Sequence, residues 1–350
     1  MQRSSSDSFT RMGSVELPLV DRFQRVHRSL RISVTDVCNI RCQYCMPDGN
    51  VPFMPNQRLL SFDQIAQFVR VTAKLGVTHY RLTGGEPLMR PDLHELVQML
   101  TEIDGVHEVA VTTNGMFLAA QLPSLVRAGL KRVNISLDTL SEESFQKLSR
   151  RAGLHRVLAG IQAALAQPEI ELRLNALVLR DINWDDVIDL VSFAKQHAVV
   201  IRFIEFMPLD GRRQWSQQRM VSGEELRQLL SAHFGPLTVR PRPDSAQPST
   251  DYVFADGSAV GFIDAVTRPF CGNCDRLRIT ADGKIRNCLF GQEEWDVAPQ
   301  LRQLAQMPSL QIQHELMQTI RDCIDAKAPA HGVQDPNFQP PQRAMYQIGG

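Results

Sequence analysis

The sequence has no excess of charge of either sign and no long apolar run. Its 38 Lys and Arg residues balance 38 Asp and Glu residues, so the formal net charge at pH 7 is zero. A neutral chain has no overall field that would draw it to nucleic acid or to an anionic membrane. No run approaches the roughly 18 apolar residues that a membrane span requires. We therefore predict neither nucleic acid nor a membrane as a partner.

A phosphate-binding loop is also missing. No GxxxxGKS or GxxxxGKT pattern occurs, so a nucleotide would have to be held by basic side chains from several places in the chain. The first 13 residues are polar and Ser-rich and lack the apolar core of a secretory signal. We expect residues 1–20 to form a flexible tail, and their Arg and Ser content leaves a targeting role open.

Cysteines are few but clustered. The chain has seven of them in 350 residues. Clustered thiols in a chain without a secretory signal predict a metal site in a reducing compartment, and hence a cytoplasmic location. Cys323 is far from the other six in the sequence. It lies at helical spacing from apolar residues, so we expect it to pack in the core. The other six form two sets: Cys38, Cys42 and Cys45, and Cys271, Cys274 and Cys288.

Between about residues 30 and 206, short β-rich runs alternate with helical patterns, which is typical of βα units on a parallel sheet. Six units are too few for a closed eight-stranded barrel, so the fold class predicted is α/β, an open partial (β/α)6 barrel with its chemistry at the carboxyl ends of the strands. The predicted strands are 30–34, 78–82, 108–112, 132–137, 171–179 and 199–206, and the predicted helices include 92–103, 121–128, 155–166 and 184–196. Between the first two strands, Ser61 and Gln64 form a capping-box pattern that predicts the start of the first helix, and Gly76 predicts its end.

The pattern changes after Pro208. A helix over 223–234 precedes a Pro-rich stretch and short predicted strands, which indicates a smaller α+β module. We divide the chain into a tail (1–20), a partial barrel (21–220) and a C-terminal module (221–350). The module is expected to contain strands at 252–254, 259–263, 277–280 and 284–286 and helices at 297–306 and 309–326.

The first cysteine set directly follows the first predicted strand. Three thiolates at one edge of a sheet could hold three irons of a four-iron cluster and leave the fourth iron open for an external ligand. Structural zinc is the alternative, but it normally takes four ligands, and no His or further Cys lies nearby. Gly84 and Gly85 end the second strand and would let a ligand approach the backbone closely, although for an isolated pair of glycines a tight turn is the better explanation.

In the second cysteine set, two arginines follow Cys274 on a predicted strand. Arg276 and Arg278 would place two guanidinium groups beside a metal site, and guanidinium groups suit planar, anionic ligands. The CxxC half of this set is common in zinc knuckles, so zinc stays open here as well.

The Cys38 to Cys45 loop, with an aromatic residue before its last Cys, resembles the cluster loop of the radical S-adenosylmethionine superfamily. Within that superfamily the chain resembles the GTP 3′,8-cyclase family of molybdenum cofactor biosynthesis, from about residue 21 to the end. The motifs that carry the resemblance are LRISVTD (30–36), RLTGGEPL (81–88), TTNG (112–115), NISLD (134–138), IRFIEFM (201–207), the second cysteine set and the terminal IGG (348–350).

The resemblance implies two 4Fe–4S clusters, S-adenosylmethionine as cofactor and GTP as substrate, in a lyase reaction that joins ribose C3′ to guanine C8. One cluster would generate the radical and the other would anchor the guanine. The family often has Lys at the position of Arg173, which keeps the charge but changes the donor geometry. Matching positions imply S-adenosylmethionine contacts from Tyr44, Gly85, Ser136 and Met207, and GTP contacts from Arg31, Arg81, Thr112, Arg173, Arg276 and Arg278, with Arg202 as a further phosphate partner.

The terminal Gly349 and Gly350 have no side chains, and from the resemblance we expect them to reach toward Arg276 and the cofactor pocket. The resemblance also implies an external electron donor of the flavodoxin or ferredoxin type and a downstream cyclic pyranopterin monophosphate synthase. The oligomeric state, monomer or homodimer, stays open. Two alternatives remain: a radical enzyme that modifies peptides, for which the cysteine-rich extension is missing, and a zinc-stabilised scaffold protein.

Overall fold

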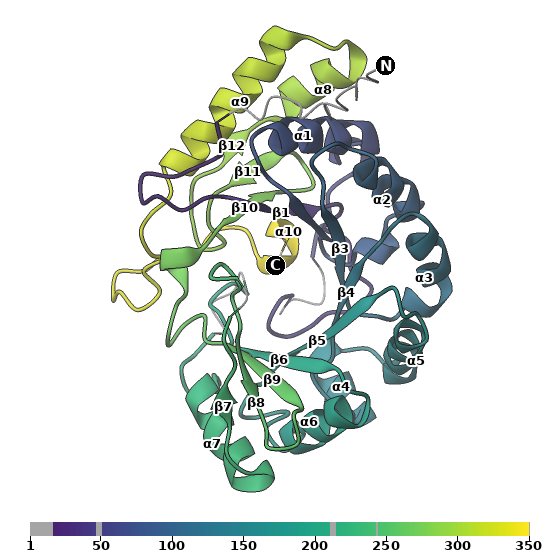
Figure 1. Cartoon of the computed structure of the whole chain (residues 1–350), viewed down its shortest axis with the longest axis vertical. Coiled ribbons are helices and arrows are strands. Elements are labelled where there is room, and N and C mark those ends of the chain that lie inside the picture. The colour runs from purple at the N-terminus through teal and green to yellow at the C-terminus, as the bar shows by residue number, and fades with distance from the viewer. Residues whose placement is uncertain (1–16, 47–50, 211–214, 243, 350) are drawn as a thin grey trace, which may run out of the picture.

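The computed structural model describes residues 17–46, 51–210, 215–242 and 244–349. Its centre is one curved 12-stranded sheet in the order β12-β11-β10-β1-β2-β3-β4-β5-β6-β9-β8-β7. Helices cover the outer side of this sheet, and the short α10 lies near the middle of the molecule, on the inner side of the curved sheet (Figure 1). The predicted α/β partial barrel is confirmed: the central strands are parallel, and the sheet does not close on itself.

Six parallel strands form the part of the sheet that the βα alternation predicts. Their apolar residues alternate with polar ones, so Leu30 and Ile32 of β1 pack in the core under the helices while Arg31 points to the other face. The strands are β1 (Ser29–Ser33), β2 (His79–Thr83), β3 (Glu108–Thr113), β4 (Arg132–Ser136), β5 (Glu171–Leu177) and β6 (Val200–Ile204).

The helices between these strands begin and end where local chemistry favours it. Ser61 and Gln64 form the capping box expected at the start of the first helix, and Gly76 follows its end with φ +86°. A helix between β4 and α5 was not among the predicted elements, and most other ends shift by a few residues. The helices are α1 (Phe62–Lys74), α2 (Leu93–Thr101), α3 (Leu118–Arg127), α4 (Glu142–Ser149), α5 (Leu154–Leu165) and α6 (Val187–Gln196), with short 3-10 turns at Asn56–Arg58 and Pro87–Met89.

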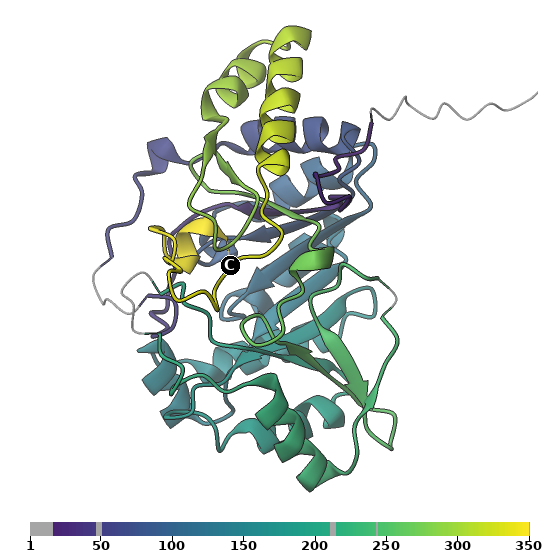
Figure 2. The same cartoon turned by 90° about the vertical axis from the view of Figure 1, so that its left-hand side faces the viewer.

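The C-terminal part of the chain extends the sheet on both sides. β9 pairs with β6 and β10 pairs with β1, both in parallel. The α8–α9 pair lies at one end of the molecule beyond β11 and β12 (Figures 1 and 2). The elements are α7 (Gly223–Phe234), β7 (Thr238–Val239), β8 (Thr250–Val253), β9 (Ala259–Ile263), a 3-10 turn at Cys271–Asn273, β10 (Arg276–Ile279), β11 (Lys284–Arg286), β12 (Trp295–Asp296), α8 (Ala298–Gln306), α9 (Leu310–Asp325) and α10 (Met345–Ile348).

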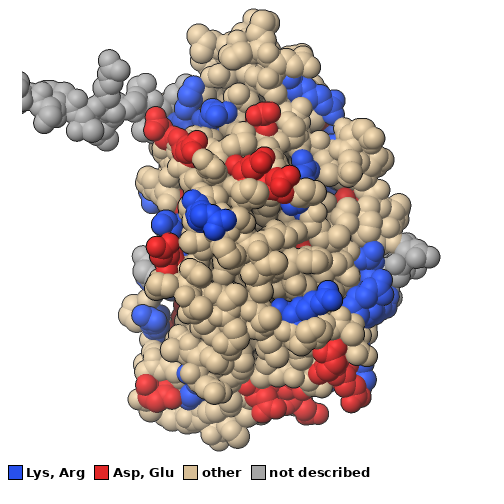
Figure 3. Space-filling model, turned by 90° about the vertical axis from the view of Figure 1, so that its right-hand side faces the viewer, with Lys and Arg blue, Asp and Glu red and all other residues tan. Residues whose placement is uncertain are grey.

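One large apolar core lies between the sheet and the outer helices. Cys323 is fully buried in it, as its helical spacing predicts. On the face that Figure 3 shows, basic and acidic side chains are interspersed in small groups, in line with the balanced composition. Within the described residues, no helix is both long enough and apolar enough to cross a membrane. The proposed boundaries at residues 20 and 220 stay predictions.

Candidate active site

Three arginines stand side by side on the concave face of the sheet. The strand register places Arg31 opposite Arg278 on one side and opposite Arg81 on the other. Because neighbouring Cβ atoms across strands are only about 5 Å apart, like charges in these positions repel each other. Arg31 and Arg81 keep some solvent-accessible surface although protein surrounds them. Both side chains are therefore half-buried.

Two further rows of polar residues continue this face. Thr112 of β3 pairs with Asn134 of β4, which pairs with Arg173 of β5. Nearer the carboxyl ends, Ser136, Asn175 and Arg202 are neighbours in register. The structure therefore brings together on one concave surface the predicted residues Arg31, Arg81, Thr112, Ser136, Arg173, Arg202, Arg276 and Arg278.

The electrostatics of this surface favour an anion. Burial lowers the pKa of Arg31 well below its usual range, and Arg278, Arg276 and Arg81 lower it further. The pKa of Arg278 falls to about 9, through burial and then through Arg276, and that of Arg81 to about 10. Among the described residues, no carboxylate forms an ion pair with these arginines. A bound polyanion would remove this repulsion and supply the missing acceptors.

Several buried donors on the same face have no partner within the described chain. They are Asn134 Nδ2, Arg202 Nε and Arg276 Nε. A buried donor without a partner costs roughly 1–3 kcal/mol. These atoms therefore mark places where a ligand oxygen or nitrogen would fit, and the residues present suit a bound nucleotide.

Arg173 and Arg202 differ from the other arginines because they already have acidic partners. Arg173 Nε donates to Glu171 Oε1 at 2.5 Å. Arg202 Nη2 lies 3.1 Å from Asp251 Oδ2. Both side chains are on the predicted face, but a ligand would have to share them with these carboxylates.

The loop after β1 carries the first cysteine set at the carboxyl edge of the sheet. All three thiols are half-buried and free of disulfides. Burial raises the pKa of Cys38 to about 11 and that of Cys45 to about 12, and it raises the pKa of Cys42 as well. A metal would bind these sulfurs by displacing their protons. The donor chemistry, three thiols with no fourth ligand beside them, fits an iron–sulfur cluster with one open iron.

Gly84 and Gly85 pack directly against this loop. A Cβ on Gly85 would lie 2.4 Å from the Val37 carbonyl oxygen, and one on Gly84 would lie 2.3 Å from that of Thr35. Both contacts are with backbone, which cannot move aside without shifting the loop. Gly84 also has φ +150°, in the region that favours glycine. The two glycines thus allow β2 to lie close to the cysteine loop, and this packing does not depend on what the loop binds.

Tyr44 is anchored by a half-buried carboxylate, that of Asp138. Its hydroxyl donates to Asp138 Oδ2 at 2.7 Å, and the amide of Leu177 donates to Asp138 Oδ1 at 2.8 Å. Burial raises the pKa of Asp138 to about 6. Tyr44 and Met207 both pack against one small buried apolar cluster. Two of the residues predicted to contact S-adenosylmethionine are therefore held by the same cluster.

The raised pKa of Asp138 predicts a pH effect on stability. The carboxyl prefers its protonated form in the folded state, so its stabilisation is complete below the unfolded value of about 4 and is lost as pH rises through 6. We expect the free energy of unfolding to fall by about 1 kcal/mol from this group between pH 5 and pH 7. Asp138→Asn should remove that decrease in anaerobic denaturant titrations. An unchanged pH profile in the variant would contradict the assignment.

The second cysteine set lies beside β10. Burial alone would raise the pKa of Cys274, but Arg276 and Lys327 outweigh it and bring the value to about 6. The Cys271 and Cys288 thiols are near enough to influence one another. As placed, no three His, Cys, Asp or Glu side chains of the described residues could hold a single metal ion. A four-iron cluster is larger and takes each thiolate at a separate iron.

The C-terminal segment enters the site. Ile348 is fully buried, and the carbonyl of Gly349 accepts a hydrogen bond from Arg278 Nη1. A Cβ at Gly349 would lie 2.6 Å from Thr83 Oγ1. The predicted approach of the tail to the arginines is therefore seen at Arg278, whereas the expected contact was with Arg276. Gly350 lies outside the described residues.

Comparison with known proteins agrees with this geometry. Residues 32–194 match the family described as Radical SAM superfamily, and residues 199–333 match Molybdenum Cofactor Synthesis C. A protein of Rhodopirellula baltica named GTP 3′,8-cyclase is 44% identical over 338 residues, which cover 95% of this chain and 92% of that protein. The chain belongs to the GTP 3′,8-cyclase family. Radical S-adenosylmethionine enzymes of this family use 4Fe–4S clusters.

One further sequence relative and one solved structure are also similar to this chain. Molybdenum cofactor biosynthesis protein 1 of Bos taurus is 39% identical over 313 residues, and the match covers 89% of this chain but 48% of that protein. The crystal structure of Streptococcus suis SuiB bound to S-adenosylmethionine has a TM-score of 0.56 at 16% identity, covering 81% of this chain and 64% of that one. The latter similarity supports the fold.

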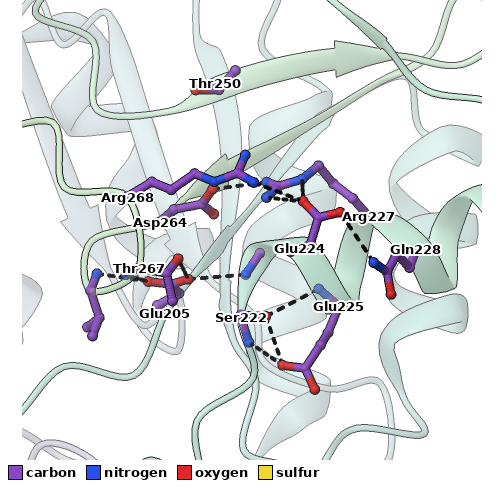
Figure 4. Close-up of polar contacts among 12 residues, drawn as sticks. Glu205, Ser222, Glu224, Glu225, Arg227, Gln228, Thr250, Asp264, Thr267 and Arg268 are labelled. Carbon is purple, nitrogen blue, oxygen red and sulfur yellow. Dashed lines mark hydrogen bonds and ion pairs between the residues drawn. The ribbon is translucent and has the colours of Figure 1, made fainter.

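Two buried glutamates of the family motifs were not among the predicted site residues. Glu86 accepts hydrogen bonds from Thr113 Oγ1 at 2.6 Å and from the Asn114 amide at 2.7 Å. Glu205 accepts from the amides of Val266 and Thr267 at 2.8 and 2.9 Å, and thereby holds the loop that leads to the second cysteine set (Figure 4). An acidic residue just after an apolar strand is the signal that could have found both.

Proposed function

We propose that this protein is a GTP 3′,8-cyclase that converts GTP to 3′,8-cyclo-7,8-dihydro-GTP, an early step of molybdenum cofactor biosynthesis. The observation that carries the proposal is the row Arg278, Arg31 and Arg81, which has no ion-paired carboxylate among the described residues and lies on the concave face between two cysteine sets. Family membership supports the same reaction.

In this proposal Cys38, Cys42 and Cys45 hold the first 4Fe–4S cluster. When bound, this cluster and S-adenosylmethionine supply a carbon radical that abstracts hydrogen. The residues matched to the cofactor are Tyr44, Gly85, Ser136 and Met207. Asp138 fixes the Tyr44 hydroxyl, and the tight contact of Gly85 with the cysteine loop fixes the distance between β2 and that loop.

The nucleotide is bound on the concave face that carries the arginines. Cys271, Cys274 and Cys288 hold the second cluster, at which the guanine binds. Arg31, Arg81, Arg276 and Arg278 pair with the triphosphate, and Thr112 offers a hydroxyl. Arg173 and Arg202 exchange part of their contact with Glu171 and Asp251 for phosphate oxygens. The rows of the sheet hold these donors in place before GTP arrives, so little side-chain entropy is lost on binding.

The C-terminal segment positions Arg278. Deleting Gly349 and Gly350 removes the carbonyl that accepts its hydrogen bond, so we expect a fall in turnover of about tenfold or more, with the fold and the iron content retained. Adding two Gly residues after Gly350 keeps the contact and serves as a control for chain length. Full turnover of the truncated protein, measured by product formation under anaerobic conditions, would contradict this role.

Metal content and products test the proposal together. Protein purified anaerobically should contain about eight irons per chain, as two four-iron clusters require. Incubation with GTP, S-adenosylmethionine and a reductant should yield 5′-deoxyadenosine and a pterin precursor. Stoichiometric zinc without iron would instead favour the scaffold protein, and an iron-replete sample that forms neither product would reject the cyclase.

The remaining parts of the proposal concern the cellular setting. An external one-electron donor of the flavodoxin or ferredoxin type reduces the first cluster, and a cyclic pyranopterin monophosphate synthase takes the product. We propose a cytoplasmic location because free thiols and clusters of this kind persist in a reducing compartment. The protein acts as a monomer or homodimer, with a barrel over 21–220 and a C-terminal module over 221–350.

A further inference from the structure

The end of α9 and the residues after it contact the surroundings of the second cysteine set. Lys327 is buried, with 3% of its surface exposed. Its Nζ lies 3.5 Å from Cys274 Sγ and 3.0 Å from the Arg276 carbonyl oxygen. No carboxylate among the described residues forms an ion pair with it. The ammonium group of Lys327 is therefore directed at a thiol and not at an acidic side chain.

Arg25 holds this segment against the cysteine loop. Its Nη1 donates to the Cys271 carbonyl at 2.7 Å, and its Nη2 donates to the Ala328 carbonyl at 2.9 Å. Asp21 fixes the guanidinium through Nε at 2.5 Å. One buried side chain from the N-terminal region thus ties the backbone of the cysteine loop to the residue after Lys327.

A third contact joins the remaining cysteine to the same segment. Asn287 precedes Cys288, and its Nδ2 donates to the Cys323 carbonyl at 2.7 Å. The chain leaves α9 here and runs down toward the middle of the molecule (Figure 2). Residues 323–328 thus contact the immediate surroundings of Cys271, Cys274 and Cys288, and none of these contacts involves a residue predicted to bind S-adenosylmethionine.

We propose that Lys327 is a positioning residue that tunes the second cluster, with Arg25 holding its segment in place. A hydrogen bond and a positive charge at a ligand sulfur stabilise the more negative, reduced form of a cluster, and the effect is large in a buried site. Lys327 therefore makes the second cluster easier to reduce by one electron. This inference rests on the proposed assignment of the second cysteine set to a 4Fe–4S cluster.

The test isolates the second cluster. A background variant with Cys38, Cys42 and Cys45 all replaced by Ala leaves only the second set to bind iron. In that background, Lys327→Met should lower the ratio of reduced to oxidised cluster at a fixed potential about tenfold, which corresponds to about 59 mV for one electron. Redox titration followed by electron paramagnetic resonance measures this ratio. Lys327→Arg should restore most of it, and Lys147→Met, at an exposed residue paired with Glu143, should leave it unchanged.

The outcomes separate this inference from the cluster assignment. A background variant that binds no iron would reject the assignment itself. An iron-replete Lys327→Met with an unchanged ratio would overturn the inference, as would an equal shift in Lys147→Met. If Lys327→Met fails to retain iron, retention in Lys327→Arg supports the role of the charge, and loss in both variants overturns it.

Arg25 gives an independent check on positioning. Arg25→Gln should reduce the iron retained by the background variant by half or more. Arg321→Gln is the matched control, because Arg321 lies on α9 and also donates to a backbone carbonyl, that of Leu17 at 2.9 Å, away from the cysteine loop. Equal iron loss in both variants would contradict the role of Arg25.

Discussion

Cys38→Ser should abolish cleavage of S-adenosylmethionine, whereas Cys271→Ser should retain some cleavage and lose cyclisation of GTP. The two thiols belong to separate sets. The first set lies on the loop after β1, whereas the second has two thiols before β10 and one after β11, so one set can lose its cluster while the other keeps it. Serine is a weak iron ligand compared with a thiolate. The measurement follows 5′-deoxyadenosine and the cyclised product separately in anaerobic assays, together with iron content.

Cys323→Ala is the matched control for these substitutions. The Cys323 side chain is fully buried in the apolar core, and the contact of this residue with Asn287 is through its backbone carbonyl, which the substitution keeps. We expect the variant to keep both activities and to lose about 1 kcal/mol of unfolding free energy, as for other small deletions in a core. Retained cyclisation in Cys38→Ser or in Cys271→Ser would contradict the proposed roles of the two sets, radical generation by the first and guanine binding by the second.

Arg31→Gln should weaken GTP binding by about 30-fold or more. Losing one partner of a buried, charge-assisted hydrogen bond costs about 2–5 kcal/mol, and each 1.4 kcal/mol is tenfold in affinity. The same substitution should leave the free energy of unfolding without GTP unchanged or raised, because it removes one of three neighbouring like charges. Calorimetric titration with GTP and denaturant unfolding measure the two effects.

Arg132→Gln provides the contrast. Arg132 lies in the same sheet but pairs with Glu108 at 2.6 Å and with Glu171 at 2.9 Å. Its replacement should destabilise the fold and change GTP affinity less than threefold. If Arg31→Gln destabilised the protein and left GTP affinity intact, the row of arginines would be structural and the proposed substrate site would be elsewhere.

Local patterns in the sequence predict much of the fold. The alternation of β-rich and helical patterns predicts the six parallel strands, and the capping box at Ser61 predicts the start of α1. The spacing of residues around Cys323 correctly assigns that thiol to the core. Each of these inferences uses residues within one or two turns or one strand, where the periodicity of the backbone governs which side is buried.

Long-range pairing could not be predicted in the same way. Nothing local to β9 or β10 indicates that they pair with β6 and β1. Arg202 pairs with Asp251, 49 positions away, so its acidic partner is not visible from its own strand. The roles of Glu86, Asp138 and Glu205 depend on amide groups that tertiary folding brings within reach. These contacts arise from the pairing of strands and loops that are far apart in the chain, which sequence periodicity does not encode.

Transfer of hydrogen from the ribose tests the central claim most directly. GTP carrying deuterium at C3′ is incubated anaerobically with the iron-replete protein, S-adenosylmethionine and a reductant, and the 5′-deoxyadenosine formed is analysed by mass spectrometry. The account predicts one deuterium in 5′-deoxyadenosine for each cyclised product. Unlabelled 5′-deoxyadenosine formed at the same rate as the product would contradict it.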